Sequence, residues 1–108
     1  GTPKREFLHV DDLASACLFL MENYNDPAIV NVGSGEEVSI AELAGLVAEA
    51  VRFQGTVRYN TDMPDGTPRK FLDVSRLANL GWRSQITLEK GIADTYAWFL
   101  AHEDGLRK

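Results

Sequence analysis

Apolar residues follow two different spacings along the chain, and each spacing predicts a different kind of element. Aromatic and branched residues gather at 5–10, which predicts a first strand. Asp11 or Asp12 is placed to cap a helix after this strand, and the turn at 25–27 ends that helix. The helix itself is predicted by apolar residues at every third or fourth position, which share one face: Leu13, Ala16, Cys17, Leu20, Met21 and Tyr24.

The rest of the chain predicts short strands between further helices. Ser39 and Glu42 have the spacing of a capping box, so a helix is expected from there to about Phe53. The other expected elements are strands at 28–32 and 56–59, a short helix at 75–81 and a last helix from about residue 87. Together they predict an α/β domain with short strands and three to four helices, too small for a complete doubly wound sheet.

Composition limits the class of protein. With 108 residues, 44% hydrophobic and 25% charged, residues 1–108 are expected to form a single globular domain. The net charge of −5 and the lack of a basic stripe argue against a nucleic-acid partner, and no apolar run is long enough for a membrane span. A single cysteine, Cys17, is expected to be a buried, inert thiol in a reducing compartment. Without a signal peptide or initiator methionine, the chain is expected to be a piece of a longer, cytoplasmic protein.

The sequence lacks the motifs of several common catalytic and cofactor sites. The stretch 33–35, Gly-Ser-Gly, lacks the third glycine of a dinucleotide-binding motif, and Glu36 and Glu37 stand where a pyrophosphate would bind. No tyrosine has a lysine four positions later, and neither His9 nor His102 has a helical ligand partner at metal-binding spacing. We interpret 33–35 as a turn and His9 as a structural histidine. The chain alone is predicted to catalyse nothing and to bind no cofactor or metal.

Two pairs of adjacent cations stand out against the acidic background. They are Lys4-Arg5 and Arg69-Lys70; of 11 cations, 7 remain without them against 16 anions, a charge of −9. Each pair follows a turn-forming segment that contains proline. A guanidinium can bind phosphate oxygens through two parallel hydrogen bonds, and a rigid flank lowers the cost of ordering such a contact. The pairs indicate either a phosphate site or ordinary surface charges that face Glu6, Asp11 or Asp73.

Two motifs in these regions resemble those of one enzyme family. The stretch 4–12, KREFLHVDD, followed by PDGTPRK at 64–70, is similar to GDP-L-fucose synthases, and the similarity continues at 31–35, 72–77, 80–82 and 96–100. The resemblance implies the C-terminal substrate-binding lobe of an extended short-chain dehydrogenase/reductase whose N-terminal Rossmann domain, absent here, holds NADP and the catalytic residues. It implies that the full-length enzyme converts GDP-4-keto-6-deoxy-D-mannose to GDP-L-fucose by 3,5-epimerisation and NADPH-dependent 4-reduction.

The resemblance also assigns roles to three residues. Arg5 is implied to bind the diphosphate of the GDP-sugar, Asp65 to accept from guanine or ribose donors, and Lys70 to make a second contact to the nucleotide end. Arg69 is a weaker candidate, because neighbouring side chains of an extended segment point to opposite sides. For Asp65 the alternative is a turn in which its carboxylate accepts from the backbone of the two following residues.

Other interpretations remain open at this point. The chain departs from the family at Met63, where lysine is frequent, and at Arg52, where glycine is usual, and it lacks a tryptophan that helps cover the ligand. It could instead be the substrate lobe of another nucleotide-sugar epimerase or dehydratase, or a stand-alone interaction module without a ligand. The first helix is apolar nearly all round, so an exposed apolar patch near Leu18 and Phe19, and self-association through it, are expected.

Overall fold

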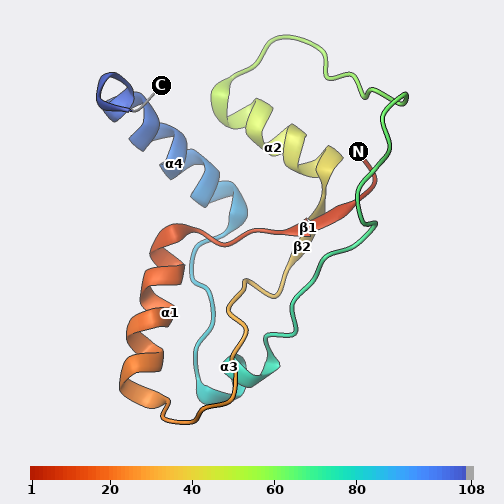
Figure 1. The fold of residues 1–108 in the computed structure, drawn as a ribbon. Coiled ribbons are helices and arrows are strands. Elements are labelled where there is room, and N and C mark those ends of the chain that lie inside the picture. The colour runs from red at the N-terminus through yellow and green to blue at the C-terminus, as the bar shows by residue number, and fades with distance from the viewer. Residues whose placement is uncertain (107–108) are drawn as a thin grey trace.

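The computed structural model describes residues 1–106, and it confirms the predicted α/β class. Figure 1 shows a short two-stranded sheet in the middle of the molecule, with α1 and α3 on one side of it and α2 and α4 on the other. The elements are β1 (Lys4–Glu6), α1 (Val10–Asn23), β2 (Glu37–Ser39), α2 (Ile40–Val51), α3 (Ser75–Leu80), α4 (Leu88–His102) and a 3₁₀ turn (Glu103–Gly105). Within the described residues, no helix is both long and apolar enough to cross a membrane.

The sheet is built around β1, which has a neighbour on each side. On one side β2 runs antiparallel to it, with Arg5 opposite Val38. On the other side Arg69 forms an isolated parallel bridge to Lys4. The segment 67–70 therefore runs beside β1 as a minimal third strand, although it comes from the far end of a long loop.

The predicted helices are confirmed because local rules fix their ends. Ser39 caps α2 through its side chain, which accepts from the backbone N–H of Glu42 at 3.1 Å, and the Glu42 carboxylate faces back to complete the capping box. The Thr87 side chain caps α4 by accepting from the backbone N–H of Lys90 at 3.2 Å, without a capping box. At the end of α2, Arg52 adopts the left-handed conformation with φ 57°. Glycine takes that conformation without steric cost, which explains why glycine is the residue expected at this position.

The strand predictions were largely wrong. Residues 28–32 and 56–59 form no strand, and β2 was not foreseen. The strand β1 (Lys4–Glu6) overlaps the predicted range 5–10 only at residues 5 and 6. A strand needs a neighbour to pair with, and β2 and the segment 67–70 occupy the two sides of β1. Val30 and Val32 instead pack against the small core as part of a coil, whereas Ile29 is exposed.

The start of α1 also differs from the prediction. His9, not an aspartate, is the N-cap: its Nδ1 accepts from the Asp11 backbone N–H at 3.0 Å, which confirms a structural role for this histidine. Asp12 is only 3% exposed and accepts from the backbone N–H groups of Gln85 and Ile86 at 3.0–3.2 Å. The Asp12 carboxylate, which lies in the first turn of α1, is therefore not the cap, and it holds the loop between α3 and α4 against this helix.

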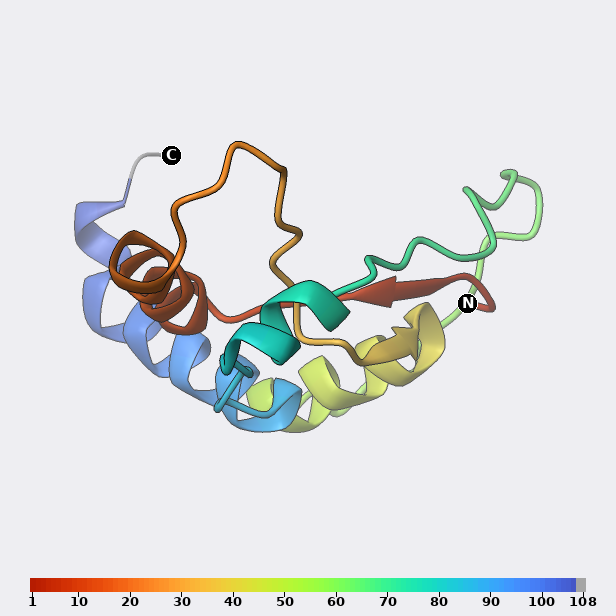
Figure 2. The ribbon, with the colours of Figure 1, turned by 90° about the horizontal axis from the view of Figure 1, so that it is seen from below.

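The core is small for a chain of this length. Ala16, Leu77 and Trp82 form the buried core cluster among the described residues, and the Trp82 indole N–H donates to Ser15 Oγ at 3.1 Å. The radius of gyration is 16.6 Å, whereas a compact domain of this length has about 13 Å. Figure 2 shows the reason, since the loop between α1 and β2 and the segment after α2 stand away from the helices.

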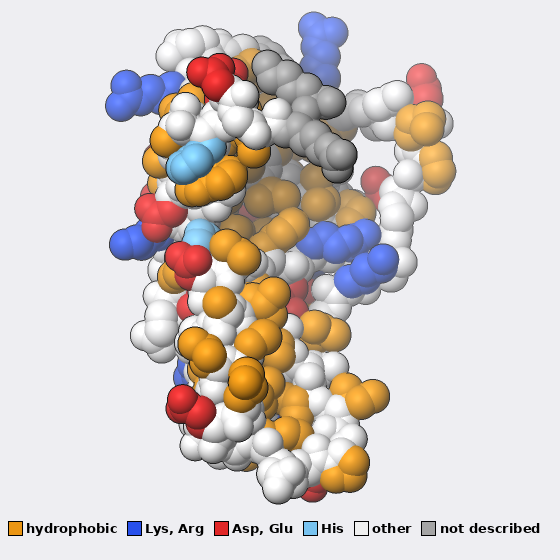
Figure 3. Space-filling model, turned by 60° about the vertical axis from the view of Figure 1, so that its left-hand side comes forward, with side chains coloured by type: hydrophobic (Ala, Val, Ile, Leu, Met, Phe, Trp, Pro, Cys, Tyr) orange, Lys and Arg blue, Asp and Glu red, His pale blue; other side chains and the backbone are white. Residues whose placement is uncertain are grey.

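Much of α1 therefore remains uncovered. Cys17 is exposed, so the prediction of a buried thiol was wrong, while Leu18 is 62% exposed as expected. Phe19 differs from the expectation, because it is half-buried and packs against the core. Figure 3 shows hydrophobic side chains along this helix in the lower half of the view. Periodicity identified the residues that share a face of the helix, but α3 and the Trp82 loop cover only the part around Ala16.

Candidate nucleotide-binding site

The backbone of Lys4 brings the two cation pairs together. Its N–H donates to the carbonyl of Pro68 at 2.9 Å, and its carbonyl accepts from the N–H of Lys70 at 3.3 Å. Residues far apart in the sequence thus become neighbours at the edge of β1. Of the three site residues predicted from the sequence, the structure brings Arg5 and Lys70 onto adjoining segments.

The Arg5 side chain holds the turn that precedes Lys70. Its Nη1 donates to the carbonyl oxygens of Lys4 and Thr67, both at 2.7 Å. A Cβ at Gly66 would lie 3.0 Å from Arg5 Nη2, so glycine leaves room for the guanidinium beside the backbone. A guanidinium has five N–H donors, and within residues 1–106 the Nε and Nη2 groups of Arg5 donate to no protein atom. The remaining donors suit an anionic ligand.

The pairing register divides the sheet into two faces of different charge. Side chains of paired residues lie on the same side of a sheet, and successive residues alternate. One side, the Glu37 face, carries the side chains of Lys4, Glu6, Glu37, Ser39 and Arg69; the other, the Arg5 face, carries those of Arg5, Val38 and Lys70.

The side-chain contacts agree with this division. On the Glu37 face, Arg69 Nε donates to Glu37 Oε2 at 2.9 Å, and the Arg69 guanidinium lies 4.9 Å from the centre of the Phe71 ring. Glu6 accepts from the Gly35 N–H at 2.7 Å on the same face. The Arg5 face has two cations and no carboxylate on these strands. It is therefore the side of the sheet on which an anion meets uncompensated positive charge.

Asp65 and Lys70 are both exposed. In the part of the chain that the structure describes, no hydrogen bond or ion pair joins Asp65 to Arg5 or Lys70, and the alternative turn with an Asp65 side-chain hydrogen bond is not formed. Met63, the first departure from the family motif, is 64% exposed at the start of the same turn. The structure therefore fixes the position of Arg5 and the course of the segment 67–70, and leaves Asp65 at the rim.

Two residues that contribute to this arrangement, Glu37 and Phe71, were not identified from the sequence. Glu37 was seen only as an obstacle to a pyrophosphate, and the partners suggested for the cation pairs were other carboxylates. Glu37 is in fact the partner of Arg69, and Phe71 stacks on the same guanidinium. The alternation of polar and apolar residues at 37–40 was the available signal, because it is typical of a short strand. Nothing in the sequence alone indicated which strand it would join.

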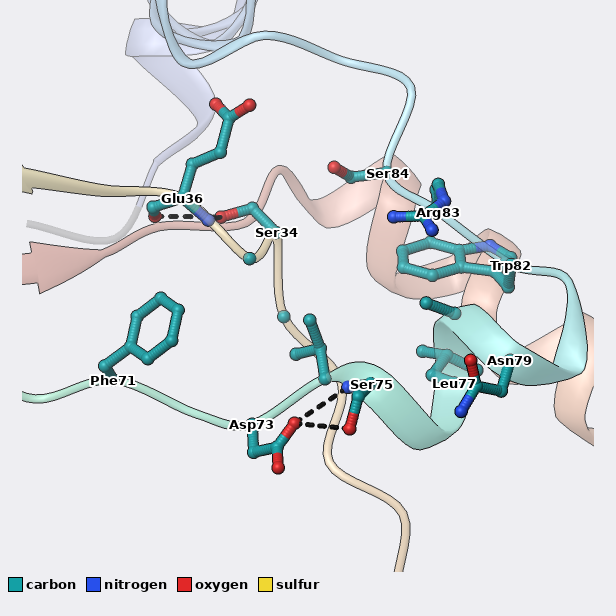
Figure 4. Close-up of a pocket in the computed structure, with 14 residues that line it drawn as sticks. Ser34, Glu36, Phe71, Asp73, Ser75, Leu77, Asn79, Trp82, Arg83 and Ser84 are labelled. Atoms are coloured by element: carbon teal, nitrogen blue, oxygen red, sulfur yellow. Dashed lines mark hydrogen bonds between the residues drawn. The ribbon is translucent and has the colours of Figure 1, made fainter.

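A cavity of about 580 Å³ lies elsewhere, between the 33–36 turn and α3. Figure 4 shows Asp73 in its wall, with the carboxylate turned toward Ser75. The Ser75 hydroxyl, and then its backbone N–H, donate to this carboxylate and lower the pKa of Asp73. Two carboxylates, Asp73 and Glu36, and one cation, Arg83, line this cavity. Its charge is poorly matched to a diphosphate, whereas the Arg5 face is well matched.

The chain is similar, first, to a broad family of enzymes. A model of the NAD-dependent epimerase/dehydratase family matches residues 1–33. In three dimensions the whole chain superposes with a TM-score of 0.92 on 35% of a GDP-L-fucose synthetase from Naegleria fowleri bound to NADP, at 31% identity.

More specific relatives confirm the resemblance to GDP-L-fucose synthases. The chain is 54% identical to GDP-L-fucose synthase 1 of Arabidopsis thaliana over 93% of its length, and 47% identical to the Escherichia coli GDP-L-fucose synthase over 99% of its length. It spans 31% and 36% of these two proteins, respectively. The chain therefore resembles, from end to end, about a third of a GDP-L-fucose synthase.

Proposed function

We propose that this chain is the substrate-binding lobe of a GDP-L-fucose synthase and that the Arg5 face binds the nucleotide end of a GDP-sugar. The observation that carries the proposal is the placement of Arg5 beside the 67–70 segment, with Lys70 on the same side of the sheet and no carboxylate of these strands opposing them. Arg5 then donates from its remaining N–H groups to the diphosphate, and Lys70 supplies a second positive charge. Asp65 accepts from guanine or ribose at the rim.

The remainder of the reaction belongs to the rest of the proposed enzyme. The described residues offer no fit for NADP: the turn at 33–35 is followed by Glu36 and Glu37, and Glu37 is paired with Arg69. We assign the cofactor and the catalytic groups to an NADP-binding domain outside these 108 residues. In this proposal the complete cytoplasmic enzyme epimerises GDP-4-keto-6-deoxy-D-mannose and reduces it to GDP-L-fucose, while this chain holds the nucleotide.

Calorimetric titration of the 108-residue chain with GDP, UDP and inorganic pyrophosphate tests the proposal. Selective binding of GDP supports a GDP-sugar lobe, and a preference for UDP favours the lobe of another nucleotide-sugar epimerase or dehydratase. Equal binding of pyrophosphate and both nucleotides would show that the site binds diphosphate without recognising the base. An assay for NADPH-dependent formation of GDP-L-fucose, with this chain joined to an NADP-binding domain of the family, tests the activity.

A stand-alone interaction module is the second candidate, and the uncovered apolar surface favours it. Leu18 and Met21 on α1 are 62% and 81% exposed, and a separate groove of about 460 Å³ between α2 and α4 is lined mostly by apolar side chains. Such a surface promotes self-association, or it packs against another domain. Sedimentation of the chain over a range of concentrations separates the two candidates. A stable oligomer that does not respond to nucleotides favours the module, and a monomer that binds GDP favours the lobe.

A further inference from the structure

We propose that Glu37 is a positioning residue of the nucleotide site: its ion pair with Arg69 sets the register of the 67–70 segment, so that Lys70 and not Arg69 faces the ligand. This inference rests on the proposed function. Glu37 itself lies on the opposite face from the proposed ligand, and it acts only through the segment that it holds.

The 67–70 segment needs this ion pair because few backbone hydrogen bonds join it to β1. Two backbone hydrogen bonds, both to Lys4, join it to β1, and the second is long at 3.3 Å. Arg5 adds a bond to Thr67 from the other face. The whole loop around it, residues 52–73, is exposed. So short a pairing leaves the register weakly specified, and a slip by one residue moves every side chain to the other face.

The consequence of a slip is unusual here because residues 69 and 70 are both cations. In the observed register Arg69 crosses β1 to reach Glu37, and Lys70 is left on the Arg5 face. A slip by one residue would place a guanidinium where the ammonium now lies. The two groups differ in shape and in donor geometry, so a ligand site adapted to one does not accept the other equally.

The ion pair has the geometry for this role. The Glu37 side chain is only 18% exposed, and it meets Arg69 Nε at 2.9 Å while Phe71 stacks on the same guanidinium. Arg69 is thereby held at two points of its planar group. Lysine at this position would lack the Nε donor, so the order Arg69-Lys70 matches the two different tasks.

Glu37→Gln tests the proposal, with Glu36→Gln as the matched control. Both changes remove one negative charge, and Glu36 is an exposed neighbour without an ion pair among the described residues. The first readout is hydrogen exchange of the Lys4 and Lys70 amides without ligand, and the second is the Kd for GDP. A positioning role predicts faster exchange of both amides and GDP binding that is roughly three- to tenfold weaker for Glu37→Gln, with neither effect for Glu36→Gln.

The sign of the affinity change separates positioning from simple electrostatics. Removing a carboxylate near a phosphate site strengthens anion binding if its charge is all that matters, so stronger or unchanged GDP binding by Glu37→Gln overturns the proposal. Unchanged amide exchange overturns it independently of GDP. If the wild-type chain binds no GDP, the proposed function fails and the site role of Glu37 fails with it, while the exchange data still report whether the pair holds the segment.

A charge swap completes the test. In the double variant Glu37→Arg with Arg69→Glu, the ion pair is restored in reverse, so exchange protection and GDP affinity are expected to recover most of their wild-type values. A swap that recovers protection but not affinity would show that Arg69 contacts the ligand itself, which contradicts the proposal. Circular dichroism of each variant establishes that the helices are retained.

Discussion

The two faces of the small sheet use the same kinds of residue in different ways. On the Glu37 face each carboxylate has a partner in the protein: Glu37 pairs with Arg69, and Glu6 accepts from Gly35. On the Arg5 face, Arg5 donates to backbone carbonyls and Lys70 faces solvent, with no carboxylate of the same strands near them. The first face stabilises the fold, and the second leaves its positive charge available to a ligand. Adjacent cations in the sequence can thus serve different purposes because an extended backbone turns them apart.

Replacing the cation that both holds the turn and faces the ligand should have the largest effect. Arg5→Gln removes charge-assisted hydrogen bonds worth about 1.5–3 kcal/mol, which corresponds to roughly tenfold to hundredfold weaker GDP binding. Arg76→Gln, the same charge change at an exposed position of α3, is the matched control and should leave the affinity within about twofold. Calorimetry measures both, and equal losses for the two variants would mean that only the overall charge matters.

Glu6→Ala should destabilise the Glu37 face without weakening ligand binding. The backbone N–H of Gly35 loses its partly buried acceptor, which costs about 1–2 kcal/mol of unfolding free energy. The GDP affinity of the folded chain should change by less than about twofold, because Glu6 points away from the proposed ligand. Thermal unfolding and calorimetry together check this, and a tenfold loss of affinity would erase the distinction between the faces.

Lys70→Gln should have a smaller effect that is confined to the ligand. An exposed ammonium contributes on the order of 1 kcal/mol or less to an ion pair, so GDP binding should weaken roughly threefold to fivefold and more at low salt than at high salt. Unlike Glu37→Gln, this variant should keep wild-type exchange at the Lys4 and Lys70 amides. Faster exchange would indicate that Lys70 also holds the segment.

Lowering the pH should have the smallest effect. The group concerned, Asp73, lies outside both faces of the sheet. The pKa of Asp73 is lowered from 3.8 by the Ser75 hydroxyl and backbone N–H, and the folded-state pKa therefore lies below the unfolded one. Its stabilising contribution is complete above the unfolded value and is lost as the pH falls through the folded value. The carboxyl ¹³C shift of Asp73 should titrate at higher pH in Ser75→Ala. A titration identical to that of the wild type would rule out the Ser75 hydroxyl as a cause.

Local rules explain which parts of the fold could be predicted. The ends of α2 and α4 follow from Ser39, Glu42 and Thr87, because a cap is made by residues a few positions apart. The strands could not be predicted in the same way, since β1 is defined by neighbours that come from 37–39 and 67–70. The prediction that Cys17 is buried was wrong for a related reason. Periodicity places Cys17 on the inner face of α1 without specifying what covers that face.

The site was predictable only in part. Resemblance selected Arg5, Asp65 and Lys70, whose roles stay predictions, and the contact of Arg69 with Glu37 agrees with the weaker candidacy given to Arg69. The roles of Glu37 and Thr67 depend on a register between distant segments, which composition and spacing do not contain. The proximity of Arg5 to the turn is likewise a tertiary property.

The most direct test of the account is an amide NMR titration of the 108-residue chain with GDP, using UDP as the control. Binding at the Arg5 face predicts GDP-selective shifts at Arg5 and at residues 65–70, with little change at 33–36 and 73–79 around the separate cavity. Shifts centred on that cavity, or none at millimolar GDP, would contradict the assignment of the Arg5 face as the nucleotide site.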